Sequence, residues 1–380
     1  MRSVVRLSWQ HHDPLRGFRT GVSLHSHTLH SREKLEFIPR LALRVPLLSW
    51  EFRRLQRRFE ASTGKLPDFS AAYWTPPLTP LEAFDVERTQ IEETLGLAAV
   101  VSLTDHDNIE AADCCEAAGR YIPISVEWTV PFADTFFHLG VHNLPTSTAP
   151  EWMAALTGYT RSPRTTPLQD LLSRLHEQEG VLIVLNHPMW DQAEIGRVGH
   201  TAALTALLQQ AGCRIHALEF NGLRSWNENQ RVLDLALECS RPVISGGDRH
   251  GREPNAVINL SHASNLMEFS SEIRSGQSHV LVLPQYREPL RFRILQTLMD
   301  VMGDCPGPAD RRQWMDREFY ARNGDHCVPL SCLWKDGGPR IVRCFSGGLQ
   351  LARSPAVQRM IRPWLRGPQD AAVPNSPWCK

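Results

Sequence analysis

The chain has 380 residues, 42% of them hydrophobic, and its 41 Lys and Arg balance its 41 Asp and Glu to a formal net charge of zero. The length allows a large buried core, whereas the charge balance argues against a broad cationic surface, and we expect no dedicated nucleic-acid-binding domain. No apolar run approaches the roughly 18 residues of a membrane span, the N-terminus lacks a signal-peptide pattern, and nine irregularly spaced cysteines are typical of reduced thiols, so we expect a soluble cytoplasmic protein with no membrane partner.

The first predicted strand lies in the stretch VSLHSHTLHS, an apolar run that ends in two histidines one residue apart. Alternate side chains of a strand point to the same face, so His25 and His27 should project together. A long insertion, residues 33–79, follows this strand. Its first part is basic and its second part is rich in aromatic residues and proline, which favours a helix and a loop at the mouth of a site.

Predicted helices and apolar strands then alternate along the chain. Gly96 and Gly180 are placed to end two of the helices, and Pro167 is placed to open one. The predicted helices cover residues 80–95, 166–179, 202–211, 228–239 and 266–274, and the apolar runs that follow them are LAAVV, VLIVL, IHALEF, PVISGG and SHVLVLP.

This alternation predicts parallel strands joined by crossover helices, covered on both faces. Most strands end in a potential metal ligand or hydrogen-bonding group: His25, His27, Asp105, His106, Glu127, His187, Glu219, Asn221, Asp248 and His250. Ligands at so many strand ends favour a barrel over an open sheet. We expect a barrel domain over residues 1–290 and a partly irregular extension over residues 291–380.

The chemistry of these strand-end groups predicts a metal centre. Taken singly, each has an ordinary explanation, such as a core histidine or, for Asp105, a helix N-cap. Together, imidazoles and carboxylates are ligands for Zn, Mn and Fe. Burying so many of them in an apolar barrel mouth would be costly unless cations neutralised the charge.

Six of these segments, in order, resemble the PHP (polymerase and histidinol phosphatase) domain of metal-dependent phosphoesterases. They are SLHSHT, SLTDHDNIEAA, ISVEWT, FFHLGVH, VLNHP and GGDRHG, and they span Leu24 to His250. The resemblance implies a distorted (β/α)7 barrel that holds two or three divalent metal ions, either Mn, Zn or Fe. Related amidohydrolases also begin with His-x-His, but they usually bridge their metals with a modified lysine. No lysine stands at a strand end in this chain.

The resemblance also implies a ligand set. One metal would take His25, His27, Glu127 and Asp248. Glu127 would bridge to a second metal held by His138 and His187, with His142 as the alternative to His138. A third would take His106, His250 and a residue shortly after the His-x-His pair. The family often has aspartate or histidine there, whereas this chain has Ser31-Arg32-Glu33, in which Glu33 is the nearest acidic substitute.

The implied activity is hydrolysis of a phosphate ester of a small molecule, with a nucleotide as one candidate. Two cations about 3.5–4 Å apart can clamp the attacking and leaving oxygens and lower the pKa of bound water, so a metal-bound hydroxide would attack phosphorus. Asp105 and His250 are candidate proton carriers. Asp105 could equally be a partner that fixes His106.

Three further residues are candidates for binding the substrate. An arginine fork binds phosphate bidentately, which favours Arg249 within GGDRHG and also Arg224, while Asn221 could orient ligands or substrate. Two alternatives stay open. One is an amidohydrolase-like enzyme that cleaves a C–N bond, and the other is a non-catalytic, metal-stabilised binding module.

Overall fold

The computed structural model describes residues 2–10, 12–44, 46–163, 167–323, 326–335, 337–367 and 370. One lobe contains two five-stranded sheets, ordered β1-β12-β11-β2-β5 and β10-β9-β8-β7-β6. Their strands are β1 (Arg2–Leu7), β2 (Thr20–Ser23), β5 (Ala98–Val101), β6 (Val126–Phe132), β7 (Thr135–His142), β8 (Leu182–Leu185), β9 (Ala217–Asn221), β10 (Val243–Gly246), β11 (Val257–Ser261) and β12 (Gln277–Val282).

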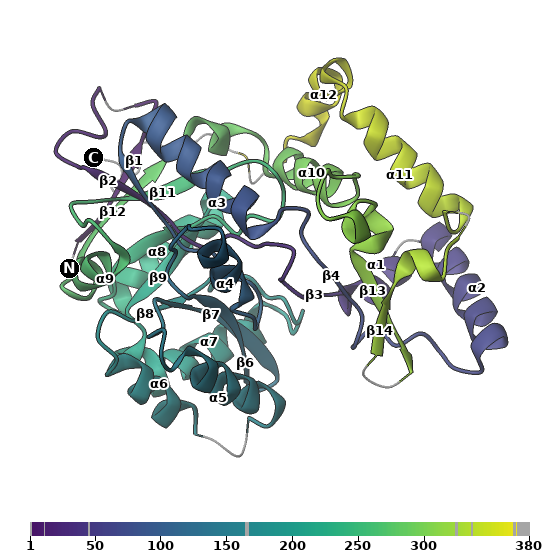
Figure 1. Cartoon of the computed structure of the whole chain (residues 1–380), viewed down its shortest axis with the longest axis horizontal. Coiled ribbons are helices and arrows are strands. Elements are labelled where there is room, and N and C mark those ends of the chain that lie inside the picture. The colour runs from purple at the N-terminus through teal and green to yellow at the C-terminus, as the bar shows by residue number, and fades with distance from the viewer. Residues whose placement is uncertain are drawn as a thin grey trace.

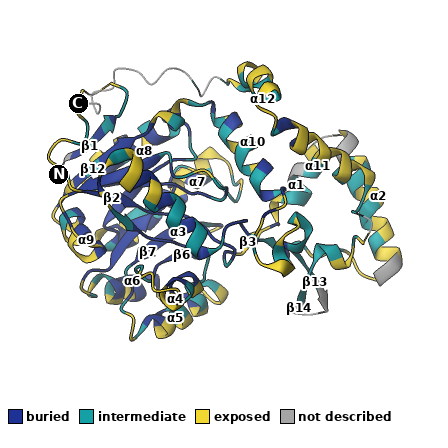
Figure 2. Ribbon diagram, turned by 45° about the horizontal axis from the view of Figure 1, so that its top comes forward, coloured by how far each residue is buried: buried dark blue, intermediate teal, exposed yellow. Residues whose placement is uncertain are grey.

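Helices surround these sheets, and the strands between them are buried (Figures 1 and 2). A capping box of Thr79 and Glu82 starts the first of them. In another, four leucines at helical spacing are buried against the main core. The helices are α3 (Pro80–Thr89), α4 (Glu110–Ala117), α5 (Ala149–Arg161), α6 (Leu168–His176), α7 (Arg197–Ala211), α8 (Trp226–Glu238) and α9 (Leu266–Arg274).

The predicted helices agree with these bounds to within a few residues, and the prediction for 266–274 coincides with α9. The turn after α3 is π-helical and ends before Gly96, which adopts a φ of 67°. Pro167 precedes α6 instead of opening it, and Thr166 of that predicted helix start lies outside the described residues. The strands β1 and β11 were not predicted.

The mixed α/β class is confirmed, but the prediction of parallel strands holds only in part. β2 with β5, β8 with β9, and β9 with β10 are parallel. β6 and β7 form an antiparallel hairpin, β7 pairs antiparallel with β8, and β11 is antiparallel to both of its neighbours. Only two residues, Ala133 and Asp134, join β6 to β7, and so short a connection forces the chain to reverse.

The predicted closed barrel is not confirmed, because no sheet of the described residues closes on itself. Among the described residues, β-bridges join the two sheets at two isolated points, Ser26 to Arg249 and His106 to Glu127. The physical reason lies in the residues that carry the candidate ligands. His25 and Asp248 have φ angles of 63° and 53°, a left-handed conformation that interrupts a regular strand ladder.

A second lobe unites the predicted insertion with the predicted C-terminal extension. Its four-stranded sheet has the order β14-β13-β4-β3, so Trp74 of the insertion pairs with Glu318 of the extension. The expected helix of the insertion is two helices. The elements are β3 (Glu33–Lys34), α1 (Phe37–Arg44), α2 (Pro46–Thr63), β4 (Tyr73–Trp74), α10 (Leu290–Val301), β13 (Glu318–Asn323), β14 (His326–Pro329), α11 (Arg340–Ala352) and α12 (Pro355–Ile361).

The division of the chain at residue 290 stays a prediction. Among the described residues, no helix is both long enough and apolar enough to cross a membrane.

Candidate metal centre

The carboxylate of Glu127 lies at the centre of five imidazoles. Its side chain is fully buried at the start of β6, where the bridge to His106 joins the two sheets. Oε2 lies 3.0 Å from His25 Nε2, 3.3 Å from His27 Nε2 and 3.2 Å from His106 Nε2, and Oε1 lies 3.1 Å from His187 Nε2 and 3.3 Å from His138 Nδ1.

Several of these buried polar atoms have no hydrogen-bond partner. They are His25 Nε2, His27 Nε2, His138 Nδ1 and Glu127 Oε2. Buried polar atoms are nearly always satisfied, because leaving one unpaired costs about 1–3 kcal/mol. Imidazole nitrogens and carboxylate oxygens directed at one another without hydrogen bonds fit divalent cations held between them.

All nine predicted ligands belong to groups whose ligand atoms lie within 4.8 Å of one another. The groups are His27–Glu33–His106–His250, His25–His27–Asp248, His25–Glu127–His187 and His106–Glu127–His138. Divalent metal binding is therefore supported. The groups divide the ligands differently from the implied set. His138 and His187 fall in separate groups that share Glu127, Glu127 is not in the group of His25, His27 and Asp248, and His27 also joins the group of Glu33, His106 and His250.

Glu33 reaches the centre from the second lobe. Its Oε2 lies 3.1 Å from His106 Nε2, and its Oε1 lies 3.1 Å from His250 Nε2. Ser31 donates a hydrogen bond of 2.7 Å to the same carboxylate. The Ser-Arg-Glu segment after His-x-His thus places an acid at the cluster. The neighbouring strand β4 adds Trp74, whose ring lies 5.6 Å from that of His250.

Charge within the cluster is strongly coupled. Burial would raise the pKa of Glu127, but the adjacent imidazoles of His25, His106 and His138 outweigh burial and hold that pKa well below its usual range. Burial lowers the pKa of His106, yet Glu33 and Glu127 raise it to about 10. For His138 burial prevails, and its pKa falls to about 4. The carboxylates therefore stay ionised and need positive charge beside them.

Glu219 was noted from the sequence only as a strand-end group, and the structure gives it a definite position. It lies at the centre of β9, fully buried, with Oε1 2.5 Å from His25 Nδ1. Its Oε2 accepts hydrogen bonds from the His187 backbone N–H at 2.7 Å and from Asn221 Nδ2 at 2.8 Å. A carboxylate on Nδ1 fixes the imidazole tautomer that leaves Nε2 free for a metal.

The paired glycines of GGDRHG make room for this arrangement. A Cβ at Gly246 would lie 1.7 Å from Glu219 Oε1, and one at Gly247 would lie 1.6 Å from Asn255 Oδ1. A side chain at either position would displace its neighbour, so Gly246 leaves room for Glu219 of β9 and Gly247 leaves room for Asn255 just before β11.

Two other predicted residues have partners outside the four groups. Asp105 accepts hydrogen bonds from the backbone N–H and Oγ1 of Thr28, at 2.5 and 2.7 Å, and burial raises its pKa to about 7. It supports the turn after His27, and the described contacts include no hydrogen bond from Asp105 to His106. His142 Nδ1 lies 2.8 Å from Ser102 Oγ, so His138 is the histidine of this strand that joins the cluster.

The predicted substrate-binding residues separate into two kinds. Arg249 is buried and donates from Nε to Glu87 Oε1 at 2.8 Å and from Nη1 to the Gly251 carbonyl at 2.9 Å, so a structural role accounts for most of its guanidinium and its binding of substrate stays a prediction. Asn221 donates to the carboxylates of Glu219 and Asp248. Arg224 differs, because its side chain is 14% exposed, with Nη2 3.4 Å from Asp248 Oδ2, and it stacks 3.5 Å above the ring centre of Trp190.

The Glu87–Arg249 pair should matter for stability. We expect Glu87→Ala to lower the free energy of unfolding by about 3–5 kcal/mol, because it leaves an uncompensated buried guanidinium. Urea unfolding followed by circular dichroism measures the change. The control is Glu92→Ala, which breaks an exposed pair with Arg88 and should cost less than about 1 kcal/mol. Equal losses in the two variants would contradict the structural role of Glu87.

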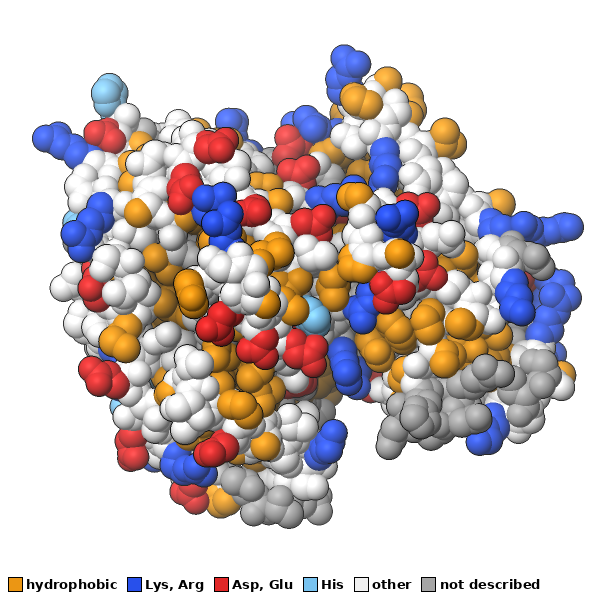
Figure 3. Space-filling model, viewed as in Figure 1, with side chains coloured by type: hydrophobic (Ala, Val, Ile, Leu, Met, Phe, Trp, Pro, Cys, Tyr) orange, Lys and Arg blue, Asp and Glu red, His pale blue; other side chains and the backbone are white. Residues whose placement is uncertain are grey.

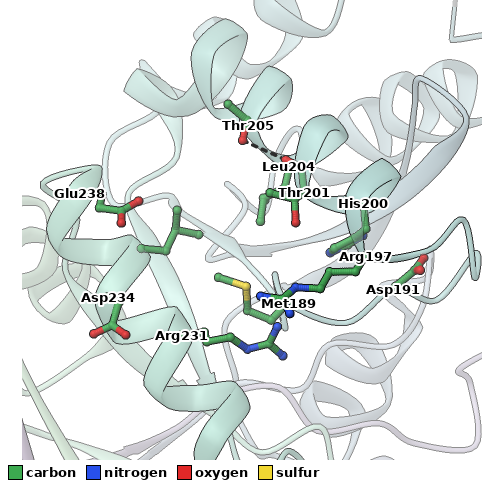
Figure 4. Close-up of a pocket in the computed structure, with 11 residues that line it drawn as sticks. Met189, Asp191, Arg197, His200, Thr201, Leu204, Thr205, Arg231, Asp234 and Glu238 are labelled. Carbon is green, nitrogen blue, oxygen red and sulfur yellow. Dashed lines mark hydrogen bonds between the residues drawn. The ribbon is translucent and has the colours of Figure 1, made fainter.

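A separate cavity of about 460 Å³ lies between α7, α8 and the loop after His187 (Figure 4). Met189 and Asp191 of that loop line it, together with Arg197, His200 and Arg231 from the two helices. None of its lining residues belongs to the four candidate metal groups. The cavity is therefore distinct from the metal centre.

Neither a scan of protein-family profiles nor a comparison with curated proteins finds a match. Similar solved structures include a provisionally assigned metal-dependent phosphoesterase from Bifidobacterium adolescentis, at 17% identity over 47% of this chain and 85% of that one, with a TM-score of 0.30. PsfC from Pseudomonas syringae is 14% identical over 74% and 97%, with a TM-score of 0.43. An amidohydrolase from Chromobacterium violaceum is 17% identical over 46% and 83%, with a TM-score of 0.33. Likenesses at these scores carry no argument about fold or activity.

Proposed function

We propose that this chain is a metal-dependent phosphoesterase of the PHP type that hydrolyses a small phosphate ester. The observation that carries the proposal is the buried Glu127 carboxylate among five imidazoles, with unpaired ligand atoms on both sides. Two or three cations held there would supply the positive charge that stabilises a transferring phosphoryl group and would acidify water.

The strand arrangement supports the PHP assignment. The two isolated bridges connect β2 and β5–β10 into a ring of seven strands that is interrupted at both bridges. A distorted (β/α)7 barrel whose metal ligands interrupt the β-ladder would have the same arrangement of strands. The candidate ligands lie at these interruptions, since His27, Glu127 and Asp248 either flank or form the bridges.

Side chains around the cluster favour a phosphate over an amide substrate. A glutamate, Glu127, takes the central position that a modified lysine usually occupies in amidohydrolases. Arg224 lies at the partly exposed edge, held by Asp248 and Trp190, where its guanidinium could bind phosphate oxygens. The Asp248 carboxylate orients this arginine, while Trp190 keeps one face of it from water.

Activity of the metal-loaded protein tests the proposal. The purified chain, stripped with a chelator and reloaded with Mn²⁺, should hydrolyse p-nitrophenyl phosphate and a nucleoside monophosphate, and the stripped chain should not. A panel of N-acyl amino acids and cyclic amides serves as the control for the amidohydrolase alternative. Turnover of an amide with no turnover of either phosphate ester would reject the proposal, and inactivity with both classes would favour a binding module.

Arg224 should act mainly on substrate affinity. We expect Arg224→Gln to raise KM for p-nitrophenyl phosphate about tenfold, since a charge-assisted hydrogen bond contributes about 1.5 kcal/mol. Arg224→Lys keeps the charge but loses the bidentate fork, so its KM should lie between that of Arg224→Gln and that of the wild type. Steady-state kinetics at saturating Mn²⁺ decide the matter, and an unchanged KM in the glutamine variant would remove Arg224 from the substrate site.

A further inference from the structure

The two lobes carry opposite charge although the whole chain is neutral. Residues 33–79 and 291–380, whose described parts include most of the second lobe, contain 22 Lys and Arg but only 13 Asp and Glu, a net charge of +9. The remaining residues contain 19 against 28, a net charge of −9. The neutral total, which argued against a nucleic-acid-binding surface, conceals this separation. Figure 3 shows acidic side chains on the first lobe beside the hollow between the lobes, and both acidic and basic side chains across it on the second lobe.

Helix α2 presents its arginines as one exposed row. Arg53, Arg54, Arg57 and Arg58 are all exposed, and their spacing places them on the same side of the helix. Trp50 extends this row by one turn, is 65% exposed, and lies 5.6 Å below the Arg54 guanidinium. From Trp50 to Arg58 the row is about 12 Å long. We call these five residues the arginine row.

The opposite side of α2 faces the interior of the second lobe. Phe52, Leu55 and Phe59 are partly buried, and the ring of Phe52 lies 5.7 Å from that of Phe69. A helix that lay on a lipid surface would need its apolar side free for insertion. Here the outward side carries four arginines and Trp50, with Glu51 paired to Arg54 at 3.0 Å and Glu60 also exposed. Arginine and tryptophan together can bind phosphates and stack on bases.

The helix before the arginine row, α1, contacts a loop next to the metal centre, while α2 itself lies at the outer edge of the second lobe (Figure 1). Just before α2, Arg44 pairs with Glu194 at 2.6 Å and Arg40 donates to the Ala193 carbonyl at 3.1 Å. Both partners lie in the barrel loop that follows the candidate ligand His187. The same lobe also contributes Glu33 to the cluster, so the lobe that carries α2 contacts the candidate metal centre, and a single strand bound on α2 would extend across this lobe to reach it.

We propose that the arginine row binds single-stranded nucleic acid, whose terminal phosphate then reaches the metal centre. This inference rests on the proposed phosphoesterase activity and extends its substrate from small esters to a polynucleotide end. The guanidinium groups pair with backbone phosphates without reading sequence, and Trp50 offers a stacking face to a base. The further exposed arginines Arg340 and Arg343 of α11, a helix without acidic residues, add to the same positive field.

Binding of a single-stranded DNA of about 20 nucleotides, measured by fluorescence anisotropy in chelator, tests the surface without hydrolysis. The test variant is Arg53→Gln/Arg57→Gln/Arg58→Gln. The control is Arg120→Gln/Arg161→Gln/Arg231→Gln, which removes the same charge from exposed barrel positions. We expect the test variant to bind at least about tenfold more weakly with a salt slope smaller by about 2, because each single-strand phosphate contact contributes about 0.7. The control should stay within about twofold of the wild type.

Several outcomes would overturn the proposal. The first is that the wild type does not bind the DNA, and the second is that both variants weaken DNA binding equally. The third is that the test variant keeps DNA binding but loses binding to phosphatidylserine vesicles, or loses self-association measured by sedimentation. Hydrolysis of p-nitrophenyl phosphate is assayed in the same preparations. DNA binding without that hydrolysis would reject the phosphoesterase activity alone, whereas hydrolysis without DNA binding would reject the surface alone.

Discussion

Replacing Glu127 with glutamine should remove at least one metal ion per chain and lower phosphoesterase activity by more than about 100-fold. Even partners one shell beyond a metal ligand cost 10–100-fold when they are lost, and Glu127 is the carboxylate shared by five imidazoles. Glutamine keeps the size of the side chain but removes its charge. Its amide N–H groups would also point toward nitrogens that should face a cation. Elemental analysis and steady-state kinetics on the same preparation measure the two effects.

The matched control for Glu127→Gln is Glu272→Gln. Glu272 accepts a hydrogen bond from Ser261 at the end of β11 and lies outside all four candidate metal groups. It should keep the wild-type metal content and activity. Two or three metals in the wild type with the same number in Glu127→Gln would show that Glu127 is not a ligand. A loss of metal without a loss of activity would refute the metal-dependent mechanism.

Glu219→Gln should weaken metal binding by about 10–100-fold without unfolding the chain. The Glu219 carboxylate accepts a hydrogen bond from His25 Nδ1–H, so that Nε2 faces the metal. It also accepts one from the backbone N–H of His187. Glutamine can offer its N–H group to Nδ1 and so stabilise the wrong tautomer. Titration of the stripped protein with Mn²⁺ against a competing chelator gives the affinity. The unfolding midpoint in chelator reports whether the fold itself is affected.

Gly246→Ala tests the role of Glu219 in a second way, without replacing Glu219 itself. Its Cβ would lie 1.7 Å from Glu219 Oε1 and must displace that carboxylate from His25. We therefore expect metal affinity to fall as it does in Glu219→Gln. The control is Gly158→Ala in α5, where nothing lies within 4 Å of the added carbon. Wild-type affinity in both Glu219→Gln and Gly246→Ala would show that Glu219 has no part in positioning His25.

Local sequence patterns were sufficient to predict five helices of the first lobe, α3 and α6–α9, and the chemistry of the candidate ligands. The period of the leucines in α6 and the capping box of α3 depend only on neighbours along the chain. The ligands could be predicted because each follows an apolar run, and strand ends of one barrel lie on one face. Glu33 came instead from the resemblance to the PHP family, as the nearest acidic residue after the His-x-His pair.

Pairing of distant segments could not be predicted in this way. An apolar run such as VINLS of β11 shows that it is buried but not which strand it will pair with or in which direction. The left-handed φ angles of His25 and Asp248 interrupt the ladder, and sequence patterns give no signal for them in residues other than glycine. The ion pair of Arg249 with Glu87 could not be foreseen either, because the two residues lie 162 positions apart in the sequence.

By itself, then, the sequence determined the α/β class, the positions of five helices of the first lobe and the set of imidazoles and carboxylates suited to divalent metals. Only the tertiary structure decided that β3 and β4 join β13 in a second lobe, that Glu219 orients His25, and that a neutral chain separates into lobes of opposite charge. Short-range patterns record which residues are buried and which helices they form. Contacts between segments hundreds of residues apart depend on how the whole chain packs, and no local pattern contains that information.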